Sequence, residues 1–150
     1  MRAVDSVLVG VIRPLRHAVL RPGQPMGAAA YPQDDDPETL HLAAYDESGA
    51  VVGCATFFPE ALDRVPAWRL RGMATAPAAR GEGYGVEILA RGLEELRRRG
   101  VPLLWCNART SAVGFYERFG FERRGAEFDL PPLGPHYLLV CKPCTVTFER

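Results

Sequence analysis

The sequence predicts a single α/β domain, residues 1–150, built on one mixed β-sheet, and three observations carry this prediction. The chain has 150 residues, of which 47% are hydrophobic and 24% charged; this size and composition suit one domain with a substantial core. Its apolar residues follow strand-like periods in some segments and helical periods in others. Residues 67–106 have the pattern strand, loop, helix, strand, which joins two parallel strands by a right-handed crossover.

The N-terminal half is predicted to hold one helix and three strands. Residues 5–25 begin as a strand or the start of a helix and continue as a helix to Leu20, because Pro22 and Pro25 then stop it. The other expected elements are a loop at 27–38, a β-hairpin of strands 39–46 and 51–59, and a strand at 67–75.

The C-terminal half contains the clearest helix, at residues 84–99. Val86, Leu89, Leu93 and Leu96 lie at helical spacing, and Gly100 is a natural C-cap. The remaining expected elements are a strand at 101–107, a helix at 111–119, and strands at 120–130 and 136–142.

Charge and cysteine usage exclude several classes of protein. The formal net charge is zero, which argues against nucleic acid or an anionic membrane as partner. No signal peptide and no apolar run of membrane-spanning length is visible, so we expect a soluble, cytoplasmic protein.

The spacing of Cys141 and Cys144 is CxxC, but no second pair or nearby His completes a metal site. Cys54 and Cys106 are predicted to be small buried hydrophobes.

Three glycines, Gly81, Gly83 and Gly85, alternate just before the helix at 84–99, and Arg80 precedes them. A helix N-terminus presents N–H groups and partial positive charge to an anion, and glycines let a ligand approach them. The spacing lacks the Lys and Ser/Thr of a Walker A loop and differs from the dinucleotide-binding fingerprint. On spacing alone, a plain loop and a phosphate-binding loop are equally good interpretations.

The segment RGEGYG, residues 80–85, resembles the acyl-CoA loop of the GNAT superfamily of acyl-CoA-dependent N-acyltransferases. That family's pattern is Arg or Gln, two residues, Gly, one residue, then Gly or Ala, and Arg80, Gly83 and Gly85 occupy its fixed positions. The segment WCNARTSAVGFYERFGF, 105–121, is similar to the family's fifth strand and following helix. The resemblance extends to 15–25, 70–85 and 134–142, and so covers nearly the whole chain.

The resemblance implies a fold, a donor and a reaction. The fold is one twisted mixed sheet of about six to seven strands flanked by helices, with its central parallel pair splayed apart around the acyl-CoA. The donor is acetyl-CoA, no metal takes part, and the acetyl group moves through a tetrahedral intermediate to a primary amine of a small molecule or a protein. The loop residues implied to hold the CoA pyrophosphate are Arg80, Gly81, Gly83, Tyr84 and Gly85.

Further contacts to the cofactor follow from the resemblance. Backbone N–H groups near Met73, Ala74 and Thr75 are implied to bind the acyl oxygen at the end of the central strand. Asn107 ends the next strand and could bind the cofactor arm or cap a turn, and Arg109 could reach a phosphate or be simply exposed.

Tyr116 is the candidate general acid for the departing thiolate. A phenol has a pKa of about 10 and a thiol one of about 8.5, close enough for useful proton donation. The alternative is a core role, because Phe115, Tyr116 and Phe119 form an aromatic stripe. The resemblance favours the general acid, because the family's tyrosine falls at the position of Tyr116.

The general base and the acceptor are less clearly indicated. Many relatives carry Glu on the central strands, where this chain has Arg69 and Arg71. The candidates for the general base are therefore His136 or Glu60, acting through water. The alternative for His136 is a structural role. Arg71 could bind a substrate carboxylate, which would favour an amino acid or another small acidic amine, or could face outward.

Three questions stay open at this stage. The alternative functions are a non-catalytic acyl-CoA sensor or interaction domain and a generic nucleotide-binding module. The three acids at 34–36 could attract a cationic amine, although a solvated loop is the simpler interpretation. Open sheet edges would permit a homodimer, but nothing in the sequence decides the oligomeric state, the acceptor or the use of other acyl groups.

Overall fold

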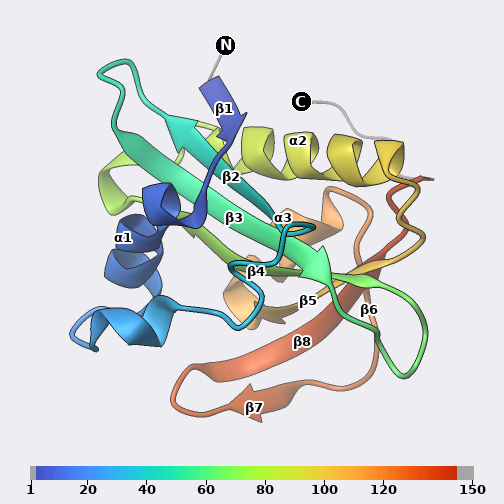
Figure 1. Cartoon of the computed structure of the whole chain (residues 1–150). Coiled ribbons are helices and arrows are strands. Elements are labelled where there is room, and N and C mark those ends of the chain that lie inside the picture. The colour runs from blue at the N-terminus through green and yellow to red at the C-terminus, as the bar shows by residue number, and fades with distance from the viewer. Residues whose placement is uncertain (1–2, 145–150) are drawn as a thin grey trace. The chain divides into compact units, whose positions relative to one another are not determined.

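The computed structural model describes residues 3–144, which form helices and one mixed β-sheet (Figure 1). The strands are β1 (Ala3–Ser6), β2 (Leu40–Tyr45), β3 (Val51–Pro59), β4 (Trp68–Thr75), β5 (Leu104–Arg109), β6 (Glu122–Arg123), β7 (Phe128–Leu130) and β8 (Gly134–Cys141). The helices are α1 (Val9–Leu20), α2 (Tyr84–Arg98) and α3 (Val113–Glu117), with 3₁₀ turns η1 (Met26–Ala29), η2 (Pro77–Ala79) and η3 (Thr110–Ala112).

The sheet has eight strands in the order β1-β2-β3-β4-β5-β8-β6, with β7 paired to β8. β4 and β5 are parallel, while β5 and β8 are antiparallel. The mixed α/β class is therefore confirmed, and the sheet has more strands than the six to seven expected. β1 is the strand that the sequence allowed before α1. The additional strand arises because residues 120–130, predicted as one strand, form the separate strands β6 and β7. Between them Gly125 has a φ of +87°, which extended backbone does not allow.

The chain divides into two compact units. The first comprises the chain up to Phe58 together with Leu70–Gly92, and the second comprises Pro59–Arg69 together with the chain from Leu93 onward. None of the helices within residues 3–144 combines the length and apolar character that a membrane span requires.

In the first unit, the β2–β3 hairpin is covered by a helix on each face. Ala43 and Cys54 are register partners and share a buried cluster with Ile12 of α1. On the other face Gly92 of α2 packs directly on Phe57, since a Cβ at Gly92 would come 2.3 Å from the Phe57 ring. A side chain at position 92 would therefore push α2 off the sheet.

A charged residue is buried on the α1 face of this hairpin. Arg16 of α1 is 0% exposed. Its Nη1 donates to Asp34 Oδ2 at 2.9 Å and to Ala29 O at 2.8 Å, and its Nη2 donates to Thr56 Oγ1 at 2.6 Å. The interpretation of Asp34 as part of a solvated loop is therefore wrong: its carboxylate is almost fully buried, because a buried guanidinium requires an opposite charge and hydrogen-bond acceptors.

His41 completes this network, and its partners fix its protonation state. Its Nε2 lies 2.9 Å from Asp34 O, which only accepts, so Nε2 carries the proton. Thr56 Oγ1, which accepts from Arg16, then donates to His41 Nδ1 at 2.9 Å. Burial lowers the His41 pKa, which favours the neutral imidazole whose Nδ1 accepts from Thr56.

In the second unit, the antiparallel β5–β8 ladder has two distinct faces. Trp105 and Val140 are register partners and pack with Leu62, Ala67 and Leu103 in one buried cluster. Side chains alternate along a strand, so Cys106 and its partner Leu139 lie on the opposite face, where Cys106 interacts with Tyr116 of α3.

We expect Asp34→Asn to lower the free energy of unfolding by about 3–5 kcal/mol, because removing one partner leaves the Arg16 charge buried without compensation. Urea-induced unfolding measures this change. The matched control is Asp35→Asn, the same substitution at the next, exposed position of the loop; equal losses in both variants would contradict the role of Asp34.

The buried network also predicts how stability depends on pH. The pKa of His41 is lowered from its usual 6.5, so below about pH 6.5 the unfolded chain binds a proton that the folded chain resists, and stability falls. Burial would raise the Asp34 pKa, but bonds from Arg16 and Tyr31 outweigh it and hold the pKa below 3.8, so a further loss begins near that pH. Chemical unfolding from pH 8 to 3 measures both steps. His41→Gln should flatten the first step, and an unchanged profile would exclude His41 as its source.

Candidate functional site

The glycine loop connects the end of β4 to the start of α2. After η2, Arg80 is extended, Gly81 has a φ of +82° and Gly83 a φ of +87°. Residues with side chains rarely adopt such angles, which explains two of the three glycines. Gly85 already belongs to α2, which begins at Tyr84, and its backbone does not require glycine.

This loop presents backbone that suits an anion. The first N–H groups of an α-helix have no acceptor within the helix, and here the first helical bond runs from Glu87 N to Gly83 O at 3.1 Å. Arg80 and Gly81 are exposed, and a Cβ at Gly81 would point into open space. Arg80 Nε donates to Thr75 O at 3.3 Å, which ties the loop to the end of β4.

β4 contains a left-handed residue, Gly72, just before the three residues implied to contact the acyl group. Arg71 stacks on Tyr31, and Ala74 packs with Ile12 of α1, so both lie toward α1 although they are three residues apart. Regular alternation forbids this; the left-handed Gly72, with a φ of +68°, accounts for it. Of the residues that follow, Met73 and Thr75 are half-buried and Ala74 is buried.

The two arginines of β4 are held by aromatic rings. The Arg71 guanidinium lies 4.0 Å from the centre of the Tyr31 ring. Arg69 lies 4.5 Å from the centre of the Trp105 indole and pairs with Glu60 at 3.2 Å. Glu60, a candidate base, is thus engaged with a cation.

The other candidate base, His136, is a buried residue of β8. It is 3% exposed, and its Nδ1 donates to Gly134 O at 2.7 Å, which leaves Nε2 as the basic nitrogen. Its register partner is Arg109 of β5, and Asn107, two residues earlier in β5, lies on the same face. The structure therefore brings Asn107, Arg109 and His136 together.

Tyr116 lies on the opposite face of the same ladder, beside Cys106. It is 7% exposed, and the rings of Phe115 and Phe121 pack edge-on against it at 5.2 Å and 5.3 Å between centroids. The aromatic stripe therefore exists as packing. Burial, with a smaller contribution from Cys106, raises the pKa of Tyr116 well above 10. Tyr116 and His136 consequently face opposite sides of the sheet.

The four cysteines are free thiols. Burial raises the pKa of Cys54 to about 12 and that of Cys141 to about 12, so both stay protonated and unreactive. Within residues 3–144, no three His, Cys, Asp or Glu side chains gather as a metal site would require.

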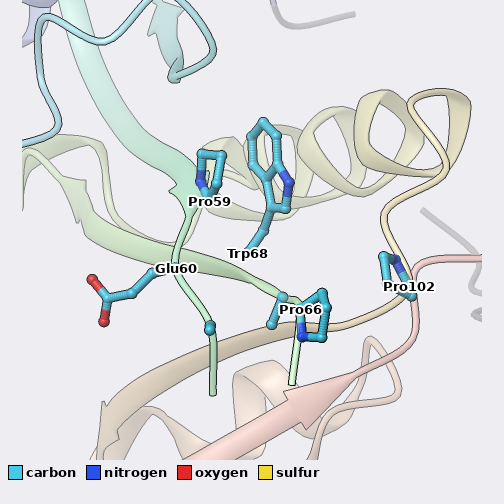
Figure 2. A pocket seen from close by; sticks show the side chains of 7 residues that line it. Pro59, Glu60, Pro66, Trp68 and Pro102 are labelled. Atoms are coloured by element: carbon cyan, nitrogen blue, oxygen red, sulfur yellow. The ribbon is translucent and has the colours of Figure 1, made fainter. Parts of the chain in front are cut away.

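The second unit also contains a pocket of about 380 Å³ that sequence reasoning missed (Figure 2). The lining residues are Pro59, Glu60, Ala61, Pro66, Ala67, Trp68 and Pro102. Six of them belong to residues 59–68, which run from the end of β3 to the start of β4, and Pro102 precedes β5.

Sequence reasoning also missed Arg16 and Tyr31 as neighbours of β4. A signal for Arg16 existed: it lies on the apolar stripe of α1, four residues after the buried Ile12. A charged residue at such a position indicates a buried partner, although the stripe does not identify Asp34 as that partner.

Comparison with known proteins identifies the family. Residues 12–121 match the model of the Acetyltransferase (GNAT) family, and the chain therefore belongs to this family. It is 32% identical over 142 residues to the "uncharacterized N-acetyltransferase YitI" of Bacillus subtilis (strain 168), which covers 93% of this chain and 95% of the relative. The chain is accordingly an acyltransferase.

Solved structures show the same fold. A chain of the NatC complex bound to Gag peptide and CoA superposes with a TM-score of 0.77 at 18% identity, over 94% of this chain and 98% of that chain. An aminoglycoside 6'-N-acetyltransferase complexed with coenzyme A gives a TM-score of 0.74 at 14% identity, over 94% and 97%. At these identities the likeness concerns the fold alone.

Proposed function

We propose that residues 1–150 act as one domain that transfers an acetyl group from acetyl-CoA to a primary amine, in the first place that of a small molecule. The observation that carries the proposal is the loop of Arg80, Gly81 and Gly83 at the N-terminus of α2, where positive φ angles and missing side chains leave backbone N–H groups accessible to a pyrophosphate. Tyr84 and Gly85 continue this binding segment. The CoA in the two superposed structures supports this choice of donor.

The left-handed Gly72 supports the proposed acyl site, because it interrupts the regular backbone of β4 just before Met73. N–H groups at Met73, Ala74 and Thr75 would stabilise the oxyanion that forms on the acyl carbon. Asn107 would hydrogen-bond the pantetheine arm, and Arg109 would contact a phosphate.

Tyr116 is proposed to protonate the leaving thiolate. Its raised pKa keeps the phenol protonated at any working pH, so the proton is present when the C–S bond breaks. The same burial makes the phenolate unfavourable afterwards and drives its reprotonation.

His136 is the preferred base. Its Nε2 can accept a proton while Nδ1 stays bound to Gly134 O, whereas the Glu60 carboxylate is paired with Arg69. In this proposal Tyr116 serves the thiolate, and His136 serves the amine through water.

A second candidate function, a non-catalytic acyl-CoA sensor, is favoured by the arginines at positions 69 and 71, where many relatives carry an acidic base. Multiple-turnover release of CoA thiol in the presence of an amine would exclude it.

We expect calorimetric titration to show that acetyl-CoA and CoA bind, whereas ATP and NAD bind weakly or not at all. Gly83→Glu should weaken acetyl-CoA binding about tenfold or more, because a carboxylate enters the phosphate site. Gly49→Glu is the matched control, since Gly49 has the same φ of +87° and open space around it, but lies in the β2–β3 turn. Equal binding of all four ligands, or equal affinity in both variants, would disprove the loop assignment.

Tyr116→Phe should lower kcat about 100-fold or more, the usual contribution of a general acid, while the Kd for acetyl-CoA stays the same. Steady-state thiol release together with calorimetry measures both quantities. Tyr137→Phe in β8 is the control for a lost phenol in the same unit. A Tyr116→Phe enzyme with wild-type kcat would assign Tyr116 to the core alone.

A further inference from the structure

We propose that the hydroxyl of Tyr31 contacts the acceptor amine and selects primary amines over secondary ones. The inference rests on the proposed function and adds to it a residue that touches the acceptor. The residues that carry it all lie in the first unit.

The Tyr31 hydroxyl lies against β4, beside the proposed acyl site. A Cβ at Gly72 would come 3.2 Å from the Tyr31 hydroxyl oxygen and 3.3 Å from Cε2 of the ring. The missing side chain at position 72 therefore lets the phenol approach the strand backbone. Met73, the first of the proposed acyl contacts, follows Gly72 directly, and one residue of a strand spans only about 3.3 Å. An amine that attacks an acyl group held at Met73 thus comes within reach of the hydroxyl.

This hydroxyl has no hydrogen-bond partner among residues 3–144. The hydrogen bonds of Tyr31 use its backbone N–H and its carbonyl, both with Asp34. The residue is 9% exposed. A tyrosine hydroxyl that is almost buried usually has a hydrogen-bond partner, and a group supplied by the substrate fits this open position.

A second polar atom without a partner lies at the same glycine. Arg16 Nε would come 3.1 Å from a Cβ at Gly72. It is fully buried and has no hydrogen-bond partner within the described part of the chain. The fully buried side-chain atoms that lack a partner do not include the Tyr31 oxygen, which therefore reaches the surface. Of the two groups that meet at Gly72, the Tyr31 hydroxyl is consequently the one that a substrate can touch.

The phenol ring is held in one position. The guanidinium carbons of Arg16 and Arg71 each lie 4.0 Å from the centroid of the ring. Asp34 fixes the backbone of Tyr31, because its Oδ2 accepts from Tyr31 N at 2.9 Å and its N donates to Tyr31 O at 3.0 Å. The same Oδ2 accepts from Arg16. A ring fixed by packing and by an ion pair brings its hydroxyl to a defined point, which is the preorganisation that a substrate contact requires.

A hydroxyl at this point distinguishes amines by their number of N–H groups. A neutral primary amine has one lone pair and two N–H groups. One N–H donates to the Tyr31 oxygen, the lone pair attacks the acyl carbon, and the proton of the other N–H passes to the base. Tyr31 keeps its own proton throughout. A secondary amine has a single N–H, which cannot bind Tyr31 and serve the base at the same time.

The test measures acetyl-CoA-dependent thiol release with a panel of primary amines, each paired with its N-methyl derivative. Tyr31→Phe removes one oxygen and keeps the ring that both guanidinium groups contact. We expect kcat/KM for the primary amines to fall about tenfold, as for one lost hydrogen bond. The kcat/KM for the N-methyl amines should stay unchanged, so the preference for primary amines falls by the same factor.

Tyr45→Phe is the matched control, because Tyr45 is a half-buried tyrosine of the same unit, at the end of β2. The Kd for acetyl-CoA and the urea midpoint should be the same in Tyr31→Phe and the wild type, which separates a lost contact from a damaged fold. Unchanged kcat/KM in Tyr31→Phe, or an equal fall for both kinds of amine, would overturn the inference and leave the proposed function intact. Absence of thiol release by the wild type with every amine would overturn the proposed function and the inference together.

Discussion

The first unit depends on the burial of one charge. Arg16 projects from α1 and has no exposed surface. An isolated charge buried there would cost several kcal/mol of folding free energy. Asp34, Thr56 and the carbonyl of Ala29 compensate it. These partners come from η1, the loop after it and β3. The hydrogen bonds and the ion pair of one side chain therefore specify how three segments pack against α1. An apolar residue of similar volume would pack there without imposing that arrangement.

The same ion pair extends to the functional part of β4. Asp34 binds Tyr31 as well as Arg16, and a Cβ at the left-handed Gly72 would lie close to both Tyr31 and Arg16. Structural and functional constraints thus meet at one glycine. The network that stabilises the first unit also holds Tyr31, the ring on which Arg71 stacks.

Local patterns in the sequence predicted most elements. α1 ends at Leu20 because prolines follow, and α2 follows the spacing of Leu89, Leu93 and Leu96. The two failures have different causes. Residues 120–130 form two strands because Gly125 between them is left-handed, whereas Asp34 is buried because its partner Arg16 lies far away in the chain. The GNAT family was predictable, since the loop at 80–85 is a contiguous motif; the roles of its residues and of Tyr116 and His136 stay predictions.

The sequence by itself determined the fold class, the family and the loop whose glycines allow backbone to approach an anion, because each depends on residues that are neighbours in the chain. Only the tertiary structure decided the partners of Arg16, the opposite orientations of Tyr116 and His136, and the stacking of Arg71 on Tyr31. These depend on strand register and side-chain alternation: a shift of one residue in the pairing of β5 with β8 would move His136 to the other face. Such registers are set by the packing of the whole core rather than by any short segment.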